Sequence, residues 1–277
     1  MKKKIIFYCP SIEDGGVEKN LFLMVNELVK TYNVSIITAN TDKKKFFDNK
    51  VVLITPSLIN IKNFFRIYKT IWCFWLGFME ISKYNKNLIL IAYESNVSAI
   101  ILSKFFNVPV IIRSNASPIG YINNFFKKFI FKFFFKFADI ILVNSGEFKK
   151  QIDKILNIKS EIIYNSIITD KKRNILAQKK IIKIKIKNNC YKLITIGRLV
   201  EQKDQLTILK ALNNIKNDLN FYLLILGKGK LKNSLKEYCI KNKIINRVKF
   251  IGYKQNIFPY LKWSDALILS SKYEGSP

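Results

Sequence analysis

The stretch Leu193-Ile-Thr-Ile-Gly-Arg-Leu-Val-Glu-Gln-Lys203 decides the predicted fold of the chain. Its first four residues form a short run typical of a buried strand, and a glycine turn joins them to a helix that we expect to begin at about Lys203. A helix N-terminus presents unpaired N–H groups, so Lys203 in its first turn favours a bound anion. Arg198, on the connecting loop, carries a planar guanidinium suited to phosphate oxygens. The alternative is an ordinary strand–helix junction with two solvated cations.

The same alternation of strands and helices extends outward from this stretch in both directions. The other apolar runs that predict strands are Ile5–Cys9, Val34–Thr38, Leu88–Ala92, Val108–Ile112, Ile140–Val143, Glu161–Tyr164, Phe221–Leu226, Val248–Ile251 and Ala266–Leu269. Strands that alternate with helices indicate parallel, doubly wound sheets. We therefore predict an α/β fold with two Rossmann-like domains, residues 1–168 and 191–277, joined by a lysine-rich linker at residues 169–190.

Two motifs of the second domain resemble a known family. They are Gly197-Arg-Leu-Val-Glu-Gln-Lys203 and the segment from Trp263 to Pro277, which ends in Glu274-Gly-Ser-Pro277. Together they closely resemble the retaining, nucleotide-sugar-dependent glycosyltransferases of group 1 (GT4), which have the two-domain GT-B fold. The resemblance implies that Arg198 and Lys203 hold the donor diphosphate and that Glu274 contacts the transferred sugar. These three are the candidate catalytic residues.

The resemblance also extends to the first domain. It implies that this domain is on the acceptor side. Gly15, Gly16 and Glu18 match a Gly-Gly-x-Glu segment that approaches the donor phosphates, although the two glycines can equally serve turn geometry alone. Many relatives carry a histidine near the reacting sugar after the strand at Val108–Ile112. This chain has none, so Arg113 or Asn115 is the candidate substitute for that sugar contact.

The resemblance predicts that the second domain is incomplete. In the family a second Glu follows the first by eight positions, and here that position lies beyond Pro277. We therefore expect a fragment of a longer chain or a truncated gene product. The alternative to an active enzyme is a non-catalytic remnant that binds nucleotide or membrane.

Composition excludes several other functions. There is no histidine, and the four cysteines are scattered, which excludes zinc fingers and Ser-His-Asp or Cys-His catalysis and predicts no metal site. The formal net charge is +29, which favours a polyanion or an anionic membrane. The lysines are dispersed and no nucleic-acid-binding motif is present, so we predict no nucleic-acid partner. A dehydrogenase is disfavoured because Gly-x-Gly-x-x-Gly is absent. Gly227-Lys-Gly229 is interpreted as a plain turn in preference to a second phosphate loop.

The segment Asn123–Asp139 is rich in phenylalanine and carries lysines at 128, 132 and 136 on one predicted helical stripe. One interpretation is an interfacial helix on an anionic membrane, and the other is a core helix with one solvated edge. The longest apolar run, Ile71–Ile81, is too short to span a bilayer. We expect a cytoplasmic protein that can bind peripherally to the inner face of the cytoplasmic membrane.

The predicted reaction follows from the resemblance. A sugar passes from a nucleoside diphosphate sugar, the co-substrate, to a glycan or lipid-linked acceptor with retention of configuration, and no further cofactor is expected. If the departing diphosphate removes the proton of the acceptor hydroxyl, no basic side chain is needed, which agrees with the absence of histidine.

Overall fold

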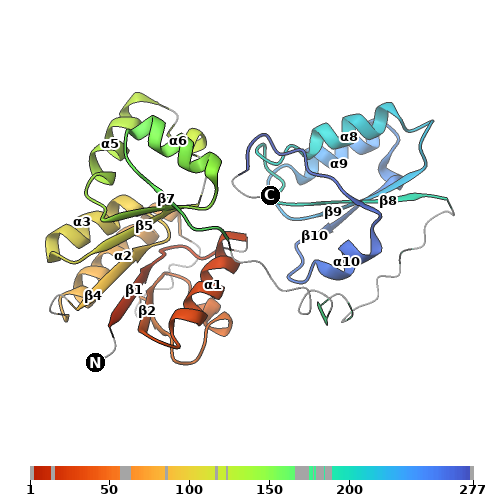
Figure 1. Cartoon of the computed structure of the whole chain (residues 1–277). Helices are drawn as coiled ribbons and strands as arrows, with labels where there is room; N and C mark the ends of the chain where they lie inside the picture. The colour runs from red at the N-terminus through yellow and green to blue at the C-terminus, as the bar shows by residue number, and fades with distance from the viewer. Residues whose placement is uncertain are drawn as a thin grey trace. The chain divides into compact units, whose positions relative to one another are not determined.

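The computed structural model describes residues 3–13, 16–56, 64–84, 87–115, 118–122, 124–165, 175–176, 178, 184 and 189–274. The chain divides into two compact units. Unit 1 comprises Met1–Ser166 and Gly275–Pro277, and unit 2 comprises Ile167–Glu274. Each unit is built on its own parallel sheet (Figure 1).

Unit 1 contains a seven-stranded sheet in the order β3-β2-β1-β4-β5-β6-β7, and every neighbouring pair is parallel. The strands are β1 (Lys4–Tyr8), β2 (Asn33–Ile37), β3 (Val52–Ile54), β4 (Leu88–Ala92), β5 (Val110–Ser114), β6 (Ile140–Val143) and β7 (Glu161–Ile162). The helices are α1 (Gly16–Leu28), the 3-10 helix η1 (Thr41–Phe46), α2 (Arg66–Ile81), α3 (Asn96–Phe106), α4 (Pro118–Tyr121), α5 (Phe125–Phe135) and α6 (Gly146–Leu156).

Both faces of this sheet are covered, because successive side chains of a strand point to opposite faces. Ile5 and Phe7 of β1 join a core that includes buried residues of α1. Ile6 and Tyr8 join the core on the other face, to which α2, α3, α5 and α6 contribute. The near-continuous apolar runs of the central strands follow from this two-sided burial.

Unit 2 contains a four-stranded parallel sheet in the order β10-β9-β8-β11. Its elements are β8 (Tyr191–Ile196), α8 (Gln205–Asn214), β9 (Phe221–Leu226), α9 (Lys232–Lys241), the 3-10 helix η2 (Ile245–Arg247), β10 (Val248–Gly252), α10 (Phe258–Trp263) and β11 (Ala266–Leu267). Leu193 packs in the core with α8 and α9, whereas Ile194 packs in the core with Tyr260 of α10. The loops that follow β8, β9 and β11 carry the motifs singled out in the sequence.

The α/β fold with two parallel sheets was predicted correctly, and the strands at Leu88–Ala92, Ile140–Val143 and Phe221–Leu226 are confirmed at both ends. Two details were wrong. The sequence analysis missed β3, a three-residue strand at the sheet edge. The helix after β8 begins at Gln205, and Lys203 is not in its first turn, because Asp204 adopts a left-handed conformation with φ 44°.

Two predictions concern residues that the structure describes only in part. Most of the predicted linker, residues 169–190, lies outside the described residues, as do Gly15 and Asn123. Among the helices that the structure does describe, none is long and apolar enough to cross a membrane.

Candidate functional site

In unit 2, two motifs separated by about seventy residues in sequence come together after β8 and β11. The Gln202 backbone and side chain bind the second motif, because its carbonyl accepts from Lys272 N at 2.9 Å and its Nε2 donates to the Tyr273 carbonyl at 3.0 Å. The Ser270 hydroxyl is within hydrogen-bonding distance of the carbonyls of Lys203 and Asp204, at 3.1 and 2.7 Å. The backbone is therefore fixed on both sides of Lys203.

The centre of this cluster is an ion pair between Lys203 and Glu274. Each side chain keeps 21% of its surface exposed, so the pair lies at the rim of the unit and not in its core. The stem of Lys203 runs beside Gly197, where an added Cβ would lie 3.3 Å from Lys203 Cδ. The sequence predicts a bound anion next to Lys203, and in the structure the neighbouring negative charge is the Glu274 carboxylate. An ammonium has three donors, so Lys203 can bind a phosphate oxygen as well.

Arg198 lies on the same loop and is exposed. Its carbonyl accepts a hydrogen bond from Gln205 Nε2 at 3.0 Å, and Gln205 is buried, so the backbone beneath the guanidinium is anchored. Within the described part of the chain, the Arg198 side chain forms no ion pair. The neighbouring exposed lysine, Lys230, pairs instead with Glu201 at 3.4 Å. Arg198 is therefore the cation of this loop with the most capacity to bind an anion.

The turn at Gly227-Lys-Gly229 packs against the backbone of this loop. A Cβ on Gly227 would lie 1.8 Å from the Gly197 carbonyl oxygen, and one on Gly229 would lie 2.3 Å from the Leu199 carbonyl oxygen. Backbone hydrogen bonds join the two loops, with Leu199 N donating to the Lys228 carbonyl and Leu231 N donating to the Leu199 carbonyl. These glycines serve close backbone packing, which accounts for them without a second phosphate loop.

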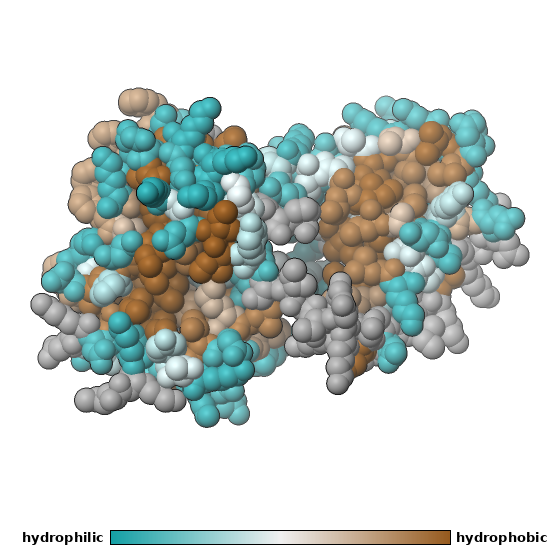
Figure 2. All heavy atoms as spheres, in the orientation of Figure 1, coloured by the Kyte–Doolittle hydropathy of each residue, from teal (hydrophilic) through white to brown (hydrophobic). Residues whose placement is uncertain are grey.

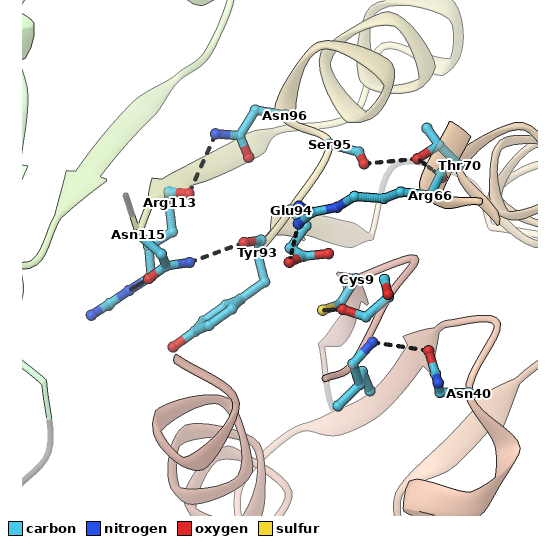
Figure 3. A network of polar contacts seen from close by, with 12 residues as sticks. Cys9, Asn40, Arg66, Thr70, Tyr93, Glu94, Ser95, Asn96, Arg113 and Asn115 are labelled. Atoms are coloured by element: carbon cyan, nitrogen blue, oxygen red, sulfur yellow. Dashed lines mark hydrogen bonds and ion pairs between the residues drawn. The ribbon is translucent and has the colours of Figure 1, made fainter. Parts of the chain in front are cut away.

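In unit 1, Arg113 lies in β5 and is 1% exposed. Its Nε donates to Asn115 Oδ1 at 3.0 Å, and its Nη2 donates to Asn165 Oδ1 at 3.0 Å and to the Ile163 carbonyl at 3.1 Å. The guanidinium also lies over the Tyr93 ring, 5.5 Å from its centroid. Figure 3 shows Arg113 and Asn115 side by side near Tyr93. The Arg113 side chain is thus buried among acceptors of its own chain, but its Nη1 has no hydrogen-bond partner in the described structure, so the sugar contact by Arg113 stays a prediction.

Asn115 is the partly exposed member of this group and remains the other candidate for that contact. Its Nδ2 donates to the Tyr93 carbonyl at 3.0 Å, so both ends of its amide are held. Asn20 of α1 completes the network, donating to the Tyr93 hydroxyl at 2.8 Å and to Asn165 Oδ1 at 3.0 Å. Burial raises the pKa of Tyr93 to about 12, although Arg113 opposes the shift.

Glu94, next to Tyr93, pairs with Arg66 of α2 (Figure 3). Its side chain is 14% exposed, and its Oε2 atom is buried without a hydrogen-bond partner in the described structure. Burial raises the pKa of the Glu94 carboxyl to about 7, Arg66 acts against this, and Glu18 and Glu13 add to it. Sequence reasoning missed Glu94, Tyr93, Asn20 and Asn165. The available signal was that Tyr93 and Glu94 directly follow a predicted strand.

Of the predicted glycine pair, Gly16 is described and Gly15 is not. Gly16 is the first residue of α1 and is exposed, and an added Cβ would meet no atom within 4 Å. The local packing therefore does not require glycine at this position. Because Gly15 lies outside the described residues, both interpretations of the glycine pair, turn geometry and close approach of a ligand, stay predictions.

Comparison with known proteins assigns the segment that carries these unit 2 loops to a family. Residues 177–277, which include Arg198, Lys203 and Glu274, match the family described as Glycosyl transferases group 1. The chain belongs to the group 1 glycosyltransferases. An uncharacterized glycosyltransferase of Methanocaldococcus jannaschii is 34% identical over an alignment of 215 positions, gaps included, that covers 71% of this chain and 53% of that relative. This group 1 chain thus spans about half the length of that curated relative.

Two further relatives extend over nearly the whole chain. One is the GalNAc-alpha-(1->4)-GalNAc-alpha-(1->3)-diNAcBac-PP-undecaprenol alpha-1,4-N-acetyl-D-galactosaminyltransferase of Campylobacter jejuni. It is 23% identical over an alignment of 289 positions, gaps included, that covers 99% of this chain and 74% of that protein. The crystal structure of Anabaena HepE in complex with UDP and glucose has a TM-score of 0.73 at 15% identity, covering 99% of this chain and 75% of HepE. The likeness to HepE confirms the fold of this group 1 glycosyltransferase.

Proposed function

We propose that this group 1 glycosyltransferase moves a sugar from a nucleoside diphosphate sugar to an acceptor hydroxyl, with retention of anomeric configuration. The observation that carries the proposal is the junction of the two family motifs in unit 2, where Lys203 contacts Glu274 and Arg198 lies exposed on the same anchored loop. Two cations and one carboxylate at a rim suit a ligand with an anionic diphosphate next to neutral sugar hydroxyls.

Each of the three side chains has a distinct role. The Arg198 guanidinium and the Lys203 ammonium bind the diphosphate and stabilise the charge that it gains as it departs. The Glu274 carboxylate accepts hydrogen bonds from sugar hydroxyls. The ion pair orients both members before the donor binds, so that less side-chain entropy is lost on binding.

The reaction balances without a basic side chain from the protein. The bond between the anomeric carbon and the diphosphate oxygen breaks, and a bond from the anomeric carbon to the acceptor oxygen forms on the same face. The proton of the acceptor hydroxyl passes to an oxygen of the departing diphosphate. The protein contributes position and charge stabilisation, which need no histidine.

The donor and acceptor classes are supported by the relatives. HepE was crystallised with UDP and glucose, which supports a uridine diphosphate sugar as the first donor to assay. The Campylobacter jejuni relative acts on a diphospho-undecaprenol-linked glycan, and this supports a lipid-linked glycan acceptor. We accordingly place the protein in the cytoplasm at the inner face of the membrane, where a soluble donor and a lipid-linked acceptor can meet.

The test is substitution of the two cations. Arg198→Ala and Lys203→Ala should each lower kcat/KM for sugar transfer by about 10²- to 10³-fold, because each removes charge stabilisation from the leaving group. The matched control is Lys230→Ala, which removes an exposed cation near the same loop that is already paired with Glu201. Calorimetric titration with UDP should show weaker binding for both variants and not for the control.

The outcomes separate the competing interpretations. Unaltered UDP binding in Arg198→Ala and Lys203→Ala would overturn the diphosphate assignment. UDP binding that depends on both cations, without transfer from any of a panel of nucleotide sugars, would instead favour the non-catalytic nucleotide-binding alternative.

A further inference from the structure

Helix α2 of unit 1 has an unusual distribution of apolar side chains. Its buried stripe, at i, i+4 spacing, consists of Lys69, Cys73, Gly77 and Ile81. The opposite stripe faces outward, with Tyr68 52%, Trp72 39%, Trp75 58% and Met79 54% exposed. A solvated helix normally carries polar residues on its outward stripe, so a helix with apolar side chains there is expected to have a further partner.

The exposed apolar surface continues beyond α2. Gly77 packs closely on α3, with an added Cβ 2.8 Å from Leu102 Cδ1, and the Phe78 ring lies 5.1 Å from the Phe105 ring. Helix α3 contacts both α2 and α5, and Figure 1 shows the three helices in one layer of unit 1. We define the aromatic face as the exposed apolar residues of this layer: Phe64, Phe65, Ile67, Tyr68, Ile71, Trp72, Trp75, Met79, Ile101, Phe105, Phe125, Phe126, Phe129, Phe133 and Phe137.

Helix α5 contributes the most exposed rings, with Phe125 86%, Phe126 71% and Phe129 62% exposed. The interpretation of this segment as a core helix with one solvated edge is therefore wrong for these rings, and it holds for Phe135, which is 1% exposed. Ordinary monomer surfaces expose apolar residues singly, whereas the aromatic face gathers fifteen of them on one layer of helices. We therefore expect an apolar partner to cover it.

Cations border the aromatic face and acidic residues are scarce on it. Lys127, Lys128 and Lys136 are exposed and Lys132 is partly exposed, and Lys104 is exposed on α3. Neither α3 nor α5 contains an acidic residue. Figure 2 shows pale brown and teal atoms next to each other over α5, at the upper left. Aromatic rings beside lysines suit the boundary between acyl chains and anionic headgroups.

We propose that the aromatic face docks on an anionic lipid bilayer, with the rings of α2 and α5 in the headgroup region and the lysines on lipid phosphates. A second copy of this chain fits poorly, because each copy has a net charge of +29 and would bring the same lysines against its partner. The inference rests on the peripheral location in the proposed function. It does not depend on sugar transfer, so vesicle binding and catalysis can fail independently.

The first test is sedimentation with vesicles of phosphatidylglycerol and phosphatidylcholine, against phosphatidylcholine alone. Joint replacement of Lys128, Lys132 and Lys136 by Glu should weaken partitioning at low salt by about 100-fold or more, since each lysine near an anionic surface contributes a factor of about five. The matched control is joint replacement of the exposed Lys232, Lys241 and Lys254 of unit 2 by Glu, which changes net charge equally. Equal losses in the two variants would overturn the assignment to this face.

The second test reports on α2 directly. Trp72 and Trp75 belong to the aromatic face, and the third tryptophan, Trp263, lies in α10 of unit 2. In the Trp263→Phe variant, anionic vesicles should shift tryptophan emission to the blue, and lipids brominated on the acyl chain should quench it. The variant with Trp72→Phe and Trp75→Phe, which keeps Trp263 as its tryptophan, should show neither the blue shift nor the quenching. Circular dichroism confirms that each variant is folded.

The third test separates charge from ring insertion. Phe65→Ser with Trp75→Ser changes two well-exposed rings, at 79% and 58%, and should abolish the binding that survives high salt. Unchanged vesicle binding in both the lysine and the ring variants would contradict the proposal. So would a dimer that forms in sedimentation velocity, is lost in the ring variant and occurs without vesicle binding, because the occupant would then be a second copy.

Discussion

Arg113, a buried cation of unit 1, and Arg198 and Lys203, two cations at the rim of unit 2, have opposite environments. Arg113 is 1% exposed and its guanidinium has three hydrogen bonds to acceptors of its own chain. Lys203 has one carboxylate partner and a side chain 21% exposed, and Arg198 is exposed. The Nε and Nη2 donors of Arg113 hold loops of its own chain together, and its buried Nη1 has no partner in the described structure, whereas a cation at a rim keeps donors for a ligand. Residue type alone therefore does not identify a binding site.

The difference follows from where each residue stands in its element. Arg113 precedes the last residue of β5, and the two residues beside it are buried, so its side chain is directed into the packed end of the sheet. Arg198 follows a glycine on the loop after β8, where the Gly227 and Gly229 turn supports the backbone and leaves the side chain outside.

The largest expected effect comes from making the same substitution in both environments. Arg113→Leu should lower the free energy of unfolding by about 3 to 5 kcal/mol, because it leaves the Asn115 and Ile163 oxygens without their donor and removes one of the two donors of Asn165 Oδ1. Arg198→Leu should change it by less than about 0.5 kcal/mol, since that side chain is exposed. Urea unfolding of both variants measures the contrast, and equal destabilisation would remove the distinction between the two cations.

Much of this could be predicted from the sequence where the signal was local. The strands with continuous apolar runs were found because both sheets are buried on two faces, which gives an unbroken signal. The Arg198, Lys203 and Glu274 set was found from motif resemblance, and the structure brings Lys203 and Glu274 into contact. Their catalytic roles remain proposals.

What sequence reasoning missed depends on contacts across long sequence separations. The network of Asn20, Tyr93, Arg113 and Asn165 joins α1 to the ends of β4, β5 and β7, and no spacing rule predicts it. The start of α8 was misplaced by two residues because the left-handed Asp204 leaves no compositional mark. The outward stripe of α2 was missed because an apolar helix gives the same pattern whether its outer face is covered or not.

One glycine in each unit allows the contrast between a packed and an open position to be tested again, with an effect of intermediate size. Gly229→Ala should lower the stability of unit 2 by about 2 to 3 kcal/mol, because the new Cβ would lie 2.3 Å from the Leu199 carbonyl oxygen and the backbone must shift. Gly16→Ala should be neutral or slightly stabilising, since nothing lies within 4 Å of its Cβ and alanine favours a helix.

Thermal unfolding of the two glycine variants, compared with the unaltered chain, gives the measurement. A neutral Gly229→Ala would show that the loop supporting Arg198 and Lys203 is not tightly packed. A strongly destabilising Gly16→Ala would show that this glycine serves the turn after all, which would remove the structural support for ligand approach at that position.

The smallest expected effect concerns the pH dependence of unit 1. Burial raises the pKa of the Glu94 carboxyl to about 7, from an ordinary value of 4.5, against the opposing charge of Arg66 and with the support of Glu18 and Glu13. Between these pH values the folded state keeps a proton that the unfolded state has lost. Because the folded state binds more protons there, the contribution of this carboxyl to the free energy of unfolding falls by about 1.4 kcal/mol per pH unit as pH rises from about 4.5 to about 7, and is constant outside this window.

Glu94→Gln should remove this dependence, because a neutral amide of the same size has no proton to lose. Arg66→Gln should extend the upper end of the window to higher pH, since Arg66 is the charge that favours the carboxylate in the folded state. Urea unfolding of the three proteins across this pH range provides the data. If the unaltered chain and Glu94→Gln show the same slope, the carboxyl is better solvated than its 14% exposure indicates. The polar cluster of unit 1 would then resemble the rim of unit 2 more closely than Arg113 suggests, and the contrast between the two regions would apply to the guanidinium alone.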